Sequence, residues 1–163
     1  MPLLSYVTAD LSSSLANIRM DITDIPYKDE SFDVVLCNHV LEHVVEDQKA
    51  MRELFRVLTQ GGWAILNSPT DPRRAKTFED PNITSPQDRE RAFGQEDHVR
   101  IYGGDYKERL KKAGFKVTVD NYVKDLDIDI VKKYGLKDED IYFCAKPLPK
   151  AHHSSNHFSS GLA

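Results

Sequence analysis

The stretch from Asp29 to Gly62, DESFDVVLCNHVLEHVVEDQKAMRELFRVLTQGG, decides the fold class of this chain. Within it, the run 34–37 is short, apolar and rich in β-branched residues, as is typical of a strand that is buried on both faces. This run ends in two polar residues, Asn38 and His39. Residues 46–58 then carry an apolar stripe at spacings of three and four, which predicts an amphipathic helix. A strand followed by such a helix indicates an α/β sheet.

The same periodicity predicts further strands and helices on both sides of this unit. The expected strands are 3–7, with an end near Asp10, then 18–22, 32–37, 63–67, 115–119 and 141–145. The expected helices are 46–58, 86–93, 105–113 and 127–133. Gly61 is expected to cap the helix that ends at residue 58 in a left-handed conformation. We therefore expect one α/β domain, residues 1–146, followed by a disordered polar tail, residues 147–163.

Composition and charge argue against several classes of function. The chain has 163 residues and a net charge of −4, which gives no electrostatic reason to bind nucleic acid or an anionic membrane. No apolar run approaches the roughly 20 residues that cross a bilayer, and no signal-peptide pattern opens the sequence. Cys37 and Cys144 lie in apolar runs and are expected to be buried, reduced thiols. We expect a cytoplasmic protein that contacts neither nucleic acid nor membrane.

Residues 69–104 form a long segment with little predicted regular structure. Its one clear signal is Ser85 followed by a proline, which predicts the start of the helix 86–93. The segment is too apolar for disorder, and a connection of this length is usually a lid or a binding loop. Because it follows the strand 63–67, we expect it to cover the carboxyl ends of the strands as a lid or substrate loop.

The pattern FDVV…LEH…E-L-x-R-V-L…GG within residues 32–62 resembles the middle of a class I S-adenosylmethionine-dependent methyltransferase domain. The resemblance covers about residues 3–146 and is strongest from Asp21 to Pro69. It implies a doubly wound, mostly parallel Rossmann-like sheet with an antiparallel terminal strand pair. It also implies that a methyl group passes from S-adenosylmethionine to a small-molecule acceptor.

The family's first strand, glycine-rich loop and first helix have no match in this chain. No glycine occurs before Gly61, so the loop that lets backbone approach the cofactor is missing. In the family, the missing strand lies between the strands that end here at Asp10 and Cys37. We therefore expect these two strands to pair directly, or a second copy in a homodimer to fill the gap.

The missing loop leaves two classes of function open. The first is a methyltransferase, truncated at a wrong start or completed by another chain, in which S-adenosylmethionine binds this chain weakly or not at all. The second is a non-catalytic relict that acts as a binding module.

The resemblance assigns cofactor contacts to residues at the ends of the strands. Asp10 would bind the ribose hydroxyls, and Asp21 with the backbone of Ile22 would meet the adenine edge. Asn38 and His39 would lie near the methionine part of the cofactor. For each acid the alternative role is to cap a turn or a helix.

His98 is the candidate base for an oxygen acceptor, because an imidazole with a pKa of about 6.5 can take a proton at neutral pH. The alternative is a histidine that packs within the lid. Arg100 and Tyr102 are candidate ligands for an anionic or polar substrate, and the alternative for both is an ordinary surface position.

The sequence His39-Val40-Leu41-Glu42-His43 also matches the H-x-x-E-H pattern of one class of zinc peptidase. Two histidines on one helix can share a metal ion, with the glutamate as base. However, His39 ends a strand, and no third ligand follows in the next helix. A zinc hydrolase is therefore the less favoured alternative, and we expect no metal site. The histidines of the tail, His152, His153 and His157, give only a compositional signal for metal.

Overall fold

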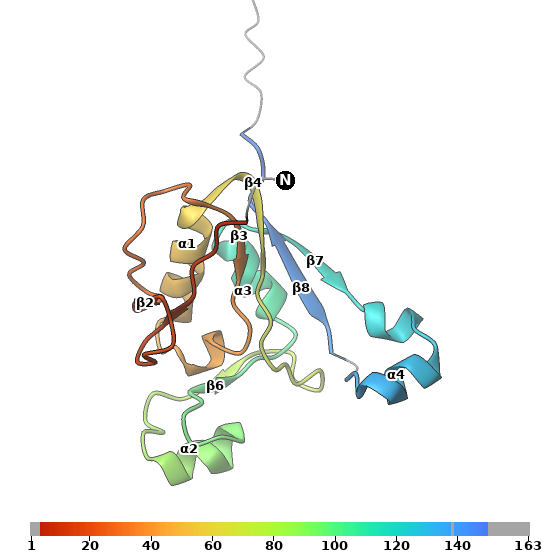
Figure 1. The fold of residues 1–163 in the computed structure, drawn as a ribbon. Helices are drawn as coiled ribbons and strands as arrows, with labels where there is room; N and C mark the ends of the chain where they lie inside the picture. The colour runs from red at the N-terminus through yellow and green to blue at the C-terminus, as the bar shows by residue number, and fades with distance from the viewer. Residues whose placement is uncertain (1–3, 138, 150–163) are drawn as a thin grey trace, which may run out of the picture.

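The computed structural model describes residues 4–137 and 139–149, which contain both strands and helices (Figure 1). The expected disordered tail, 147–163, lies outside the described residues from position 150 onward. Within the described ranges, no helix has the length and apolar character needed to cross a membrane.

Most of the described elements follow the predicted order, but residues 4–7 of the predicted strand 3–7 form no strand, and β5 and β6 were not predicted. The strands are β1 (Ala9–Asp10), β2 (Ile18–Arg19), β3 (Phe32–Leu36), β4 (Leu58–Ile65), β5 (Phe78–Glu79), β6 (Arg100–Ile101), β7 (Lys116–Asp120) and β8 (Ile141–Ala145). The α-helices are α1 (Asp47–Val57), α2 (Pro86–Phe93), α3 (Tyr106–Lys112) and α4 (Ile128–Tyr134). Two 3-10 helices are η1 (Leu41–His43) and η2 (Tyr122–Asp125).

The main sheet has four strands in the order β3-β4-β8-β7. β3 and β4 run parallel, whereas β8 is antiparallel to both of its neighbours. The sheet is therefore mixed, with a parallel pair at one side and an antiparallel terminal pair at the other. This arrangement confirms the expected α/β class and Rossmann-like sheet.

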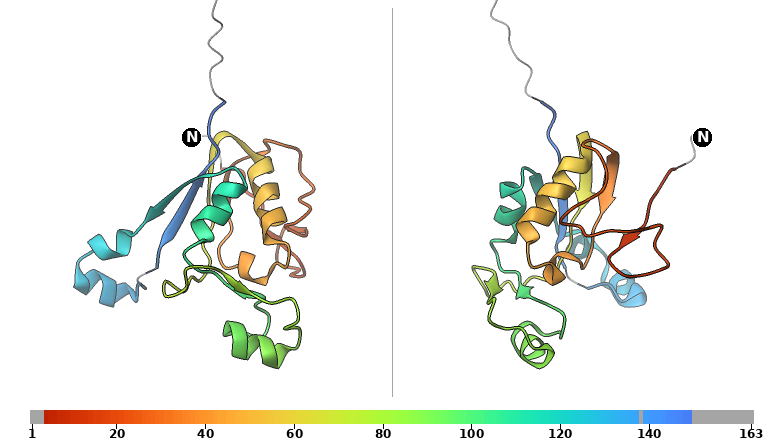
Figure 2. Two further views of the ribbon diagram at one scale, coloured as in Figure 1. Left: turned by 180° about the vertical axis from the view of Figure 1, so that it is seen from behind. Right: turned by 90° about the vertical axis from the view of Figure 1, so that its left-hand side faces the viewer.

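One face of this sheet is covered by α1 and α3, which lie on the same side of the strands in both views of Figure 2. α1 buries Ala50 and Leu54, four residues apart, so its predicted apolar stripe is the core face. Cys37 and Cys144 are free and buried, as expected. Burial raises the pKa of each of these thiols to about 12, because it penalises the thiolate.

The opposite face of the sheet is partly open. Trp63 and Phe143 stack there with ring centroids 5.3 Å apart. The strand register brings Val34 and Leu36 of β3 to the same face. These two side chains remain 42% and 68% exposed. An apolar strip on β3 is thus accessible to water in the single chain.

The expected pairing between the strands that end near Asp10 and Cys37 is wrong. β1 pairs with β2 in a separate parallel ladder, and β3 is an edge strand of the main sheet. The expectation assumed a buried gap in which unpaired peptide groups would be costly. In the structure β3 has a strand neighbour on one side alone, and peptide groups at an open edge can be satisfied by water.

The predicted helix cap at Gly61 is also wrong. α1 ends at Val57, and Leu58 already begins β4 in an extended conformation. Gly61 does have a positive φ of 80°, but it lies within β4, where the register with β3 shifts. Its left-handed backbone therefore belongs to a strand irregularity, a second common use of glycine.

Candidate functional site

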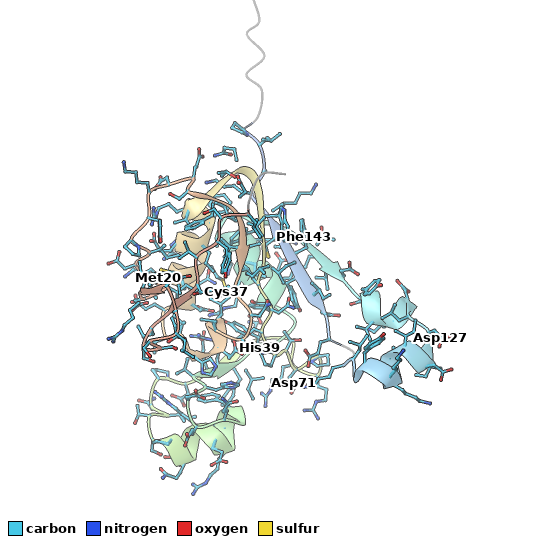
Figure 3. The ribbon with its side chains drawn as sticks, viewed as in Figure 1. Met20, Cys37, His39, Asp71, Asp127 and Phe143 are labelled. Atoms are coloured by element: carbon cyan, nitrogen blue, oxygen red, sulfur yellow. The ribbon has the colours of Figure 1, made fainter. Side chains whose placement is uncertain are left out.

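The carboxyl ends of β3 and β4 meet at one edge of the sheet, and two pockets lie there. The larger has a volume of about 490 Å³ and is lined in part by Glu42, His98 and Arg100. The smaller, about 290 Å³, is lined in part by His39. Pro69 and its neighbours Thr70 and Pro72 line both, so the pockets share a wall. Figure 3 shows His39 and Asp71 at this end of the sheet. Asp71 lines the larger pocket.

Parts of the segment 70–104 line the larger pocket at this edge. Within the segment, β5 and β6 pair antiparallel, and Thr70 forms an isolated bridge with Tyr102. The predicted start of α2 is confirmed, since the Ser85 side chain accepts a hydrogen bond from the Asp88 N–H at 3.1 Å. The role of the segment as a lid stays a prediction.

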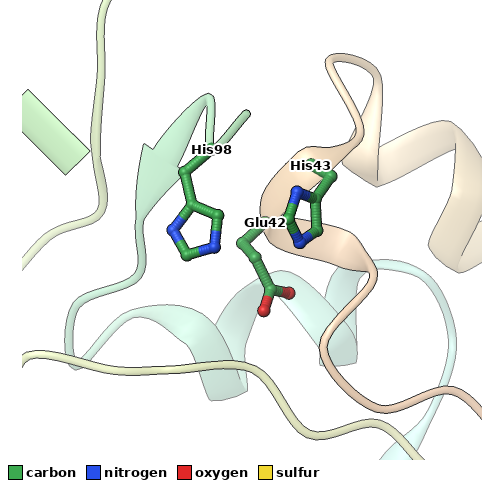
Figure 4. Close-up of side chains that lie close together, drawn as sticks. All are labelled: Glu42, His43 and His98. Atoms are coloured by element: carbon green, nitrogen blue, oxygen red, sulfur yellow. The ribbon is translucent and has the colours of Figure 1, made fainter. Parts of the chain in front are cut away.

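His98 lies against η1 and lines the larger pocket. Its half-buried ring meets His43 edge to face, with the ring centroids 4.7 Å apart. One ligating atom from each of Glu42, His43 and His98 lies within 4.8 Å of the others (Figure 4). The structure therefore groups the candidate base with two residues of the H-x-x-E-H pattern.

Glu42 is the buried centre of this group. Its side chain is 2% exposed, and the Ser68 hydroxyl donates a 2.6 Å hydrogen bond to its carboxylate. His39 contributes Nδ1 at 3.5 Å from the same carboxylate, but its own side chain is 57% exposed. As expected, His39 is not helical, and its φ is +56°. Sequence reasoning missed the partnership of Glu42 with His98, because only the fold brings these positions together.

The two acids expected to meet the cofactor both cap turns, which was their alternative role. Asp10 accepts hydrogen bonds from the N–H groups of Ser13 and Ser12 at 2.6 and 2.8 Å. These bonds, that from Ser13 most strongly, lower the pKa of the Asp10 carboxyl. Asp21 accepts one from the Thr23 N–H at 2.8 Å, and its pKa is lowered for the same reason. Both acids are exposed, and their contacts with ribose and adenine stay predictions.

The other candidate cofactor residues lie in different surroundings. Ile22 packs partly buried against the core. Asn38 is exposed, and its side-chain oxygen lies 3.4 Å from the N–H of Asn67. His39 donates its N–H to the Asn67 carbonyl at 2.8 Å. Asn38 and His39 thus follow β3 at the carboxyl edge, whereas Asp10 belongs to the separate β1–β2 ladder.

The surface position considered for Arg100 is wrong, because only 3% of its side chain is exposed. Its guanidinium donates to the carbonyls of Leu41 at 3.0 Å, Val45 at 2.8 Å, and Val44. It also donates to the Glu79 carboxylate at 2.9 Å. Arg100 therefore clamps η1 and the turn after it. Its expected contact with a substrate stays a prediction, although it lines the larger pocket.

The surface position considered for Tyr102 is wrong as well. Its side chain is fully buried, and its hydroxyl donates to Asp47 Oδ2 at 2.9 Å. Burial, followed by the charge of Asp47, raises the pKa of the Tyr102 phenol. Arg109 donates to the same carboxylate through Nε at 3.0 Å and through a terminal nitrogen at 2.8 Å. Substrate binding by Tyr102 stays a prediction. The contact of its hydroxyl with Asp47 ties the segment 70–104 to α1.

Comparison with known proteins assigns the fold and the family. Residues 4–66 match the family described as methyltransferase domain. The chain is 43% identical over 49 residues to a demethylmenaquinone methyltransferase of Clavibacter sepedonicus, a match that spans 30% of this chain and 20% of that protein. It is 31% identical over 116 residues to an uncharacterised protein of Methanocaldococcus jannaschii, spanning 71% of this chain and 53% of that protein. The matched segments thus span about half or less of these relatives.

Solved structures show the same architecture. A putative methyltransferase from Bacillus halodurans superposes with a TM-score of 0.55 at 18% identity, covering 86% of this chain and 81% of that one. An S-adenosylmethionine-dependent methyltransferase from Mesorhizobium loti gives a TM-score of 0.50 at 19% identity, covering 78% and 67%. At this identity the likeness concerns the fold alone.

Proposed function

Because this chain belongs to the methyltransferase-domain family, we propose that it serves the transfer of a methyl group from S-adenosylmethionine to a small-molecule acceptor. The observation that carries the proposal is the pair of adjoining pockets at the carboxyl ends of β3 and β4. Open α/β sheets bind their ligands at this edge. The pocket beside His39 would take the reactive end of the cofactor, and the pocket beside His98 would take the acceptor.

The residues present fit the ribose and adenine of the cofactor but not its methionine part. Asp10 is exposed and its lowered pKa keeps it ionised at neutral pH, so it can accept hydrogen bonds from ribose hydroxyls. Asp21 and the backbone of Ile22 would meet the adenine. By contrast, no glycine precedes Gly61, so no glycine loop cradles the methionine part. We propose that this chain alone binds S-adenosylmethionine weakly.

On the acceptor side, the cofactor would supply the methyl group, so the protein has to position and desolvate the acceptor. His98 would remove a proton from an acceptor hydroxyl, because its half-buried imidazole lines the larger pocket. Asp71 lines the same pocket, and hydrogen bonds from Arg73 lower its pKa to about 2. Arg100 would contribute to binding only through the part of its guanidinium that borders the pocket.

Ligand-observed NMR with S-adenosylmethionine at millimolar concentration tests the cofactor side. We expect saturation transfer to the adenine and ribose protons to exceed transfer to the methionine protons. Asp10→Ala should reduce the transfer severalfold, because it removes the ribose acceptor. Asp120→Ala, an exposed acid on β7, is the matched control and should leave it unchanged. Equal transfer to the wild type and to Asp10→Ala would contradict the assignment.

A second candidate function is the non-catalytic binding module. The observation that favours it is the apolar strip formed by Val34 and Leu36 on the edge strand β3. We further propose a cytoplasmic location, which the free, buried thiols of Cys37 and Cys144 support.

A further inference from the structure

We propose that Glu42, His43 and His98 bind a divalent transition metal ion, for which zinc is the best fit. Their ligating atoms, one from each residue, lie within 4.8 Å of one another, and the three side chains converge in Figure 4. Imidazole nitrogens and a carboxylate oxygen are ligands that zinc prefers. Three protein ligands with a fourth position left open are typical of catalytic zinc sites.

Hydrogen bonds hold η1, which carries Glu42 and His43, beside the segment that carries His98. η1 carries Glu42 and His43 on consecutive positions. The residue after His98 is Val99, whose N–H donates to the Glu42 carbonyl at 2.9 Å. Arg100, one position further, clamps the carbonyl of Leu41 in η1 and that of Val45 in the turn after it. Residues far apart in the sequence are therefore fixed beside each other before any ion binds, which reduces the ordering that metal binding requires.

Two of the three side chains, His43 and Glu42, have partners of the kind found in the outer shell of a metal site. Asp97 Oδ2 lies 3.2 Å from Nδ1 of His43, which leaves Nε2 as the ligating atom. A carboxylate behind a histidine orients the ring and makes it a stronger ligand. Ser68 likewise holds the Glu42 carboxylate through a 2.6 Å hydrogen bond. Glu42 is 2% exposed, and a buried carboxylate needs a compensating positive charge that a dication would supply.

The distances require only a small adjustment. Two ligands at about 2.1 Å from a tetrahedral zinc ion are about 3.4 Å apart, so the present 4.8 Å limit must shrink by at most about 1.4 Å. His43 is 30% exposed and His98 is half-buried, so both rings have room to turn. Glu42 and His98 also line the cavity of about 490 Å³, which gives the fourth position access to a ligand.

This site differs from the zinc peptidase pattern in the sequence, because His98 replaces His39. It also stands on the geometry alone and does not depend on the proposed methyl transfer. A bound ion would engage the His98 imidazole, so metal binding and proton removal by His98 exclude each other.

Titration with Zn²⁺, in competition with a chromophoric chelator, tests the proposal. The full chain should carry His152→Ala, His153→Ala and His157→Ala, because the tail histidines could bind zinc on their own. We expect one ion per chain with micromolar or tighter affinity. His98→Ala and His43→Ala should each weaken binding at least tenfold, whereas His39→Ala should change it less than twofold.

Thermal unfolding provides a readout that separates loss of the site from loss of the fold. Zn²⁺ should raise the Tm of the parent chain, because an ion that binds only the folded state stabilises it. Without metal, His98→Ala should have the same Tm as the parent, and Zn²⁺ should no longer raise that Tm. If the alanine variant unfolds, His98→Gln serves the same purpose. Absence of saturable binding at micromolar Zn²⁺, or binding that survives the change at His98, would overturn the proposal. If zinc binding is lost in His39→Ala and kept in His98→Ala, the ion binds at the H-x-x-E-H pattern of the sequence, and the proposal is overturned as well.

Discussion

At the scale of single residues, Asp47 at the start of α1 links this helix to α3 and to the segment 70–104. Its carboxylate is nearly buried and accepts hydrogen bonds from Tyr102 and from two nitrogens of Arg109. Arg100 adds a longer ion pair, with its Nε 3.9 Å from Asp47 Oδ2. A buried carboxylate between two guanidinium groups is stable only while every partner is present.

Asp47→Asn should therefore destabilise the chain strongly. The change keeps the shape but removes the charge that compensates Arg109 and Arg100, and we expect the free energy of unfolding to fall by about 3 kcal/mol. Urea unfolding followed by circular dichroism measures the loss. Glu108→Gln is the control, since Glu108 pairs with exposed Lys111 on the surface and should change stability by less than about 0.5 kcal/mol. Equal effects for the two variants would show that the network does not stabilise the fold.

Residue type alone made His98 a candidate base, a role that stays a prediction, and the structure places His98 in the wall of the larger pocket. Arg100 and Tyr102 became candidate substrate ligands in the same way, and that role is also a prediction. Their burial was missed because their partners on η1 and α1 come from a distant part of the chain. Partnerships of this kind depend on tertiary packing, which local patterns do not encode.

At the scale of elements, apolar periodicity predicted α1 and the last strand well, because each buries one face. The start of α2 was predicted from its cap, Ser85 followed by a proline. The strand predicted over residues 3–7 is wrong for the residues that the structure describes, since 4–7 form no strand. Strand β1 contains only Ala9–Asp10, and Tyr6 remains 74% exposed. A strand also needs a neighbouring ladder, and the sequence of one segment does not show whether a neighbour exists.

The turn between α3 and β7 allows a sharp test of local strain. Gly114 has a φ of +115°, and an added Cβ would lie 2.9 Å from the ring of Phe55. Gly114→Ala should therefore lower the free energy of unfolding by about 2–4 kcal/mol through backbone strain and ring displacement.

Gly94, the left-handed cap of α2, is the matched control for Gly114. It has a φ of +86°, but an added Cβ would meet nothing within 4 Å. Gly94→Ala should then cost only the backbone strain, about 1 kcal/mol. Chemical unfolding of both variants measures the difference. A Gly114→Ala chain as stable as Gly94→Ala would contradict the tight packing against Phe55.

At the scale of the whole molecule, the open edge of β3 bears on assembly. We propose that a second copy pairs there in a homodimer, since an apolar edge strand is a template for another strand. Leu36→Lys should shift sedimentation toward the monomer at every concentration and leave the fold intact, because Leu36 is 68% exposed. Ile128→Lys, at a 60% exposed position on α4, is the control and should leave the sedimentation of the chain unchanged. A monomeric wild type at high concentration would contradict the pairing.

The central claim for the molecule is that it carries the adenosine-facing residues of a methyltransferase without a glycine loop for the methionine part. Calorimetric titration of the 163-residue chain with S-adenosylmethionine tests this most directly. We predict a dissociation constant near the millimolar range, equivalent to a binding free energy of about 4 kcal/mol, and no saturable heat at micromolar ligand. A micromolar dissociation constant would contradict the claim.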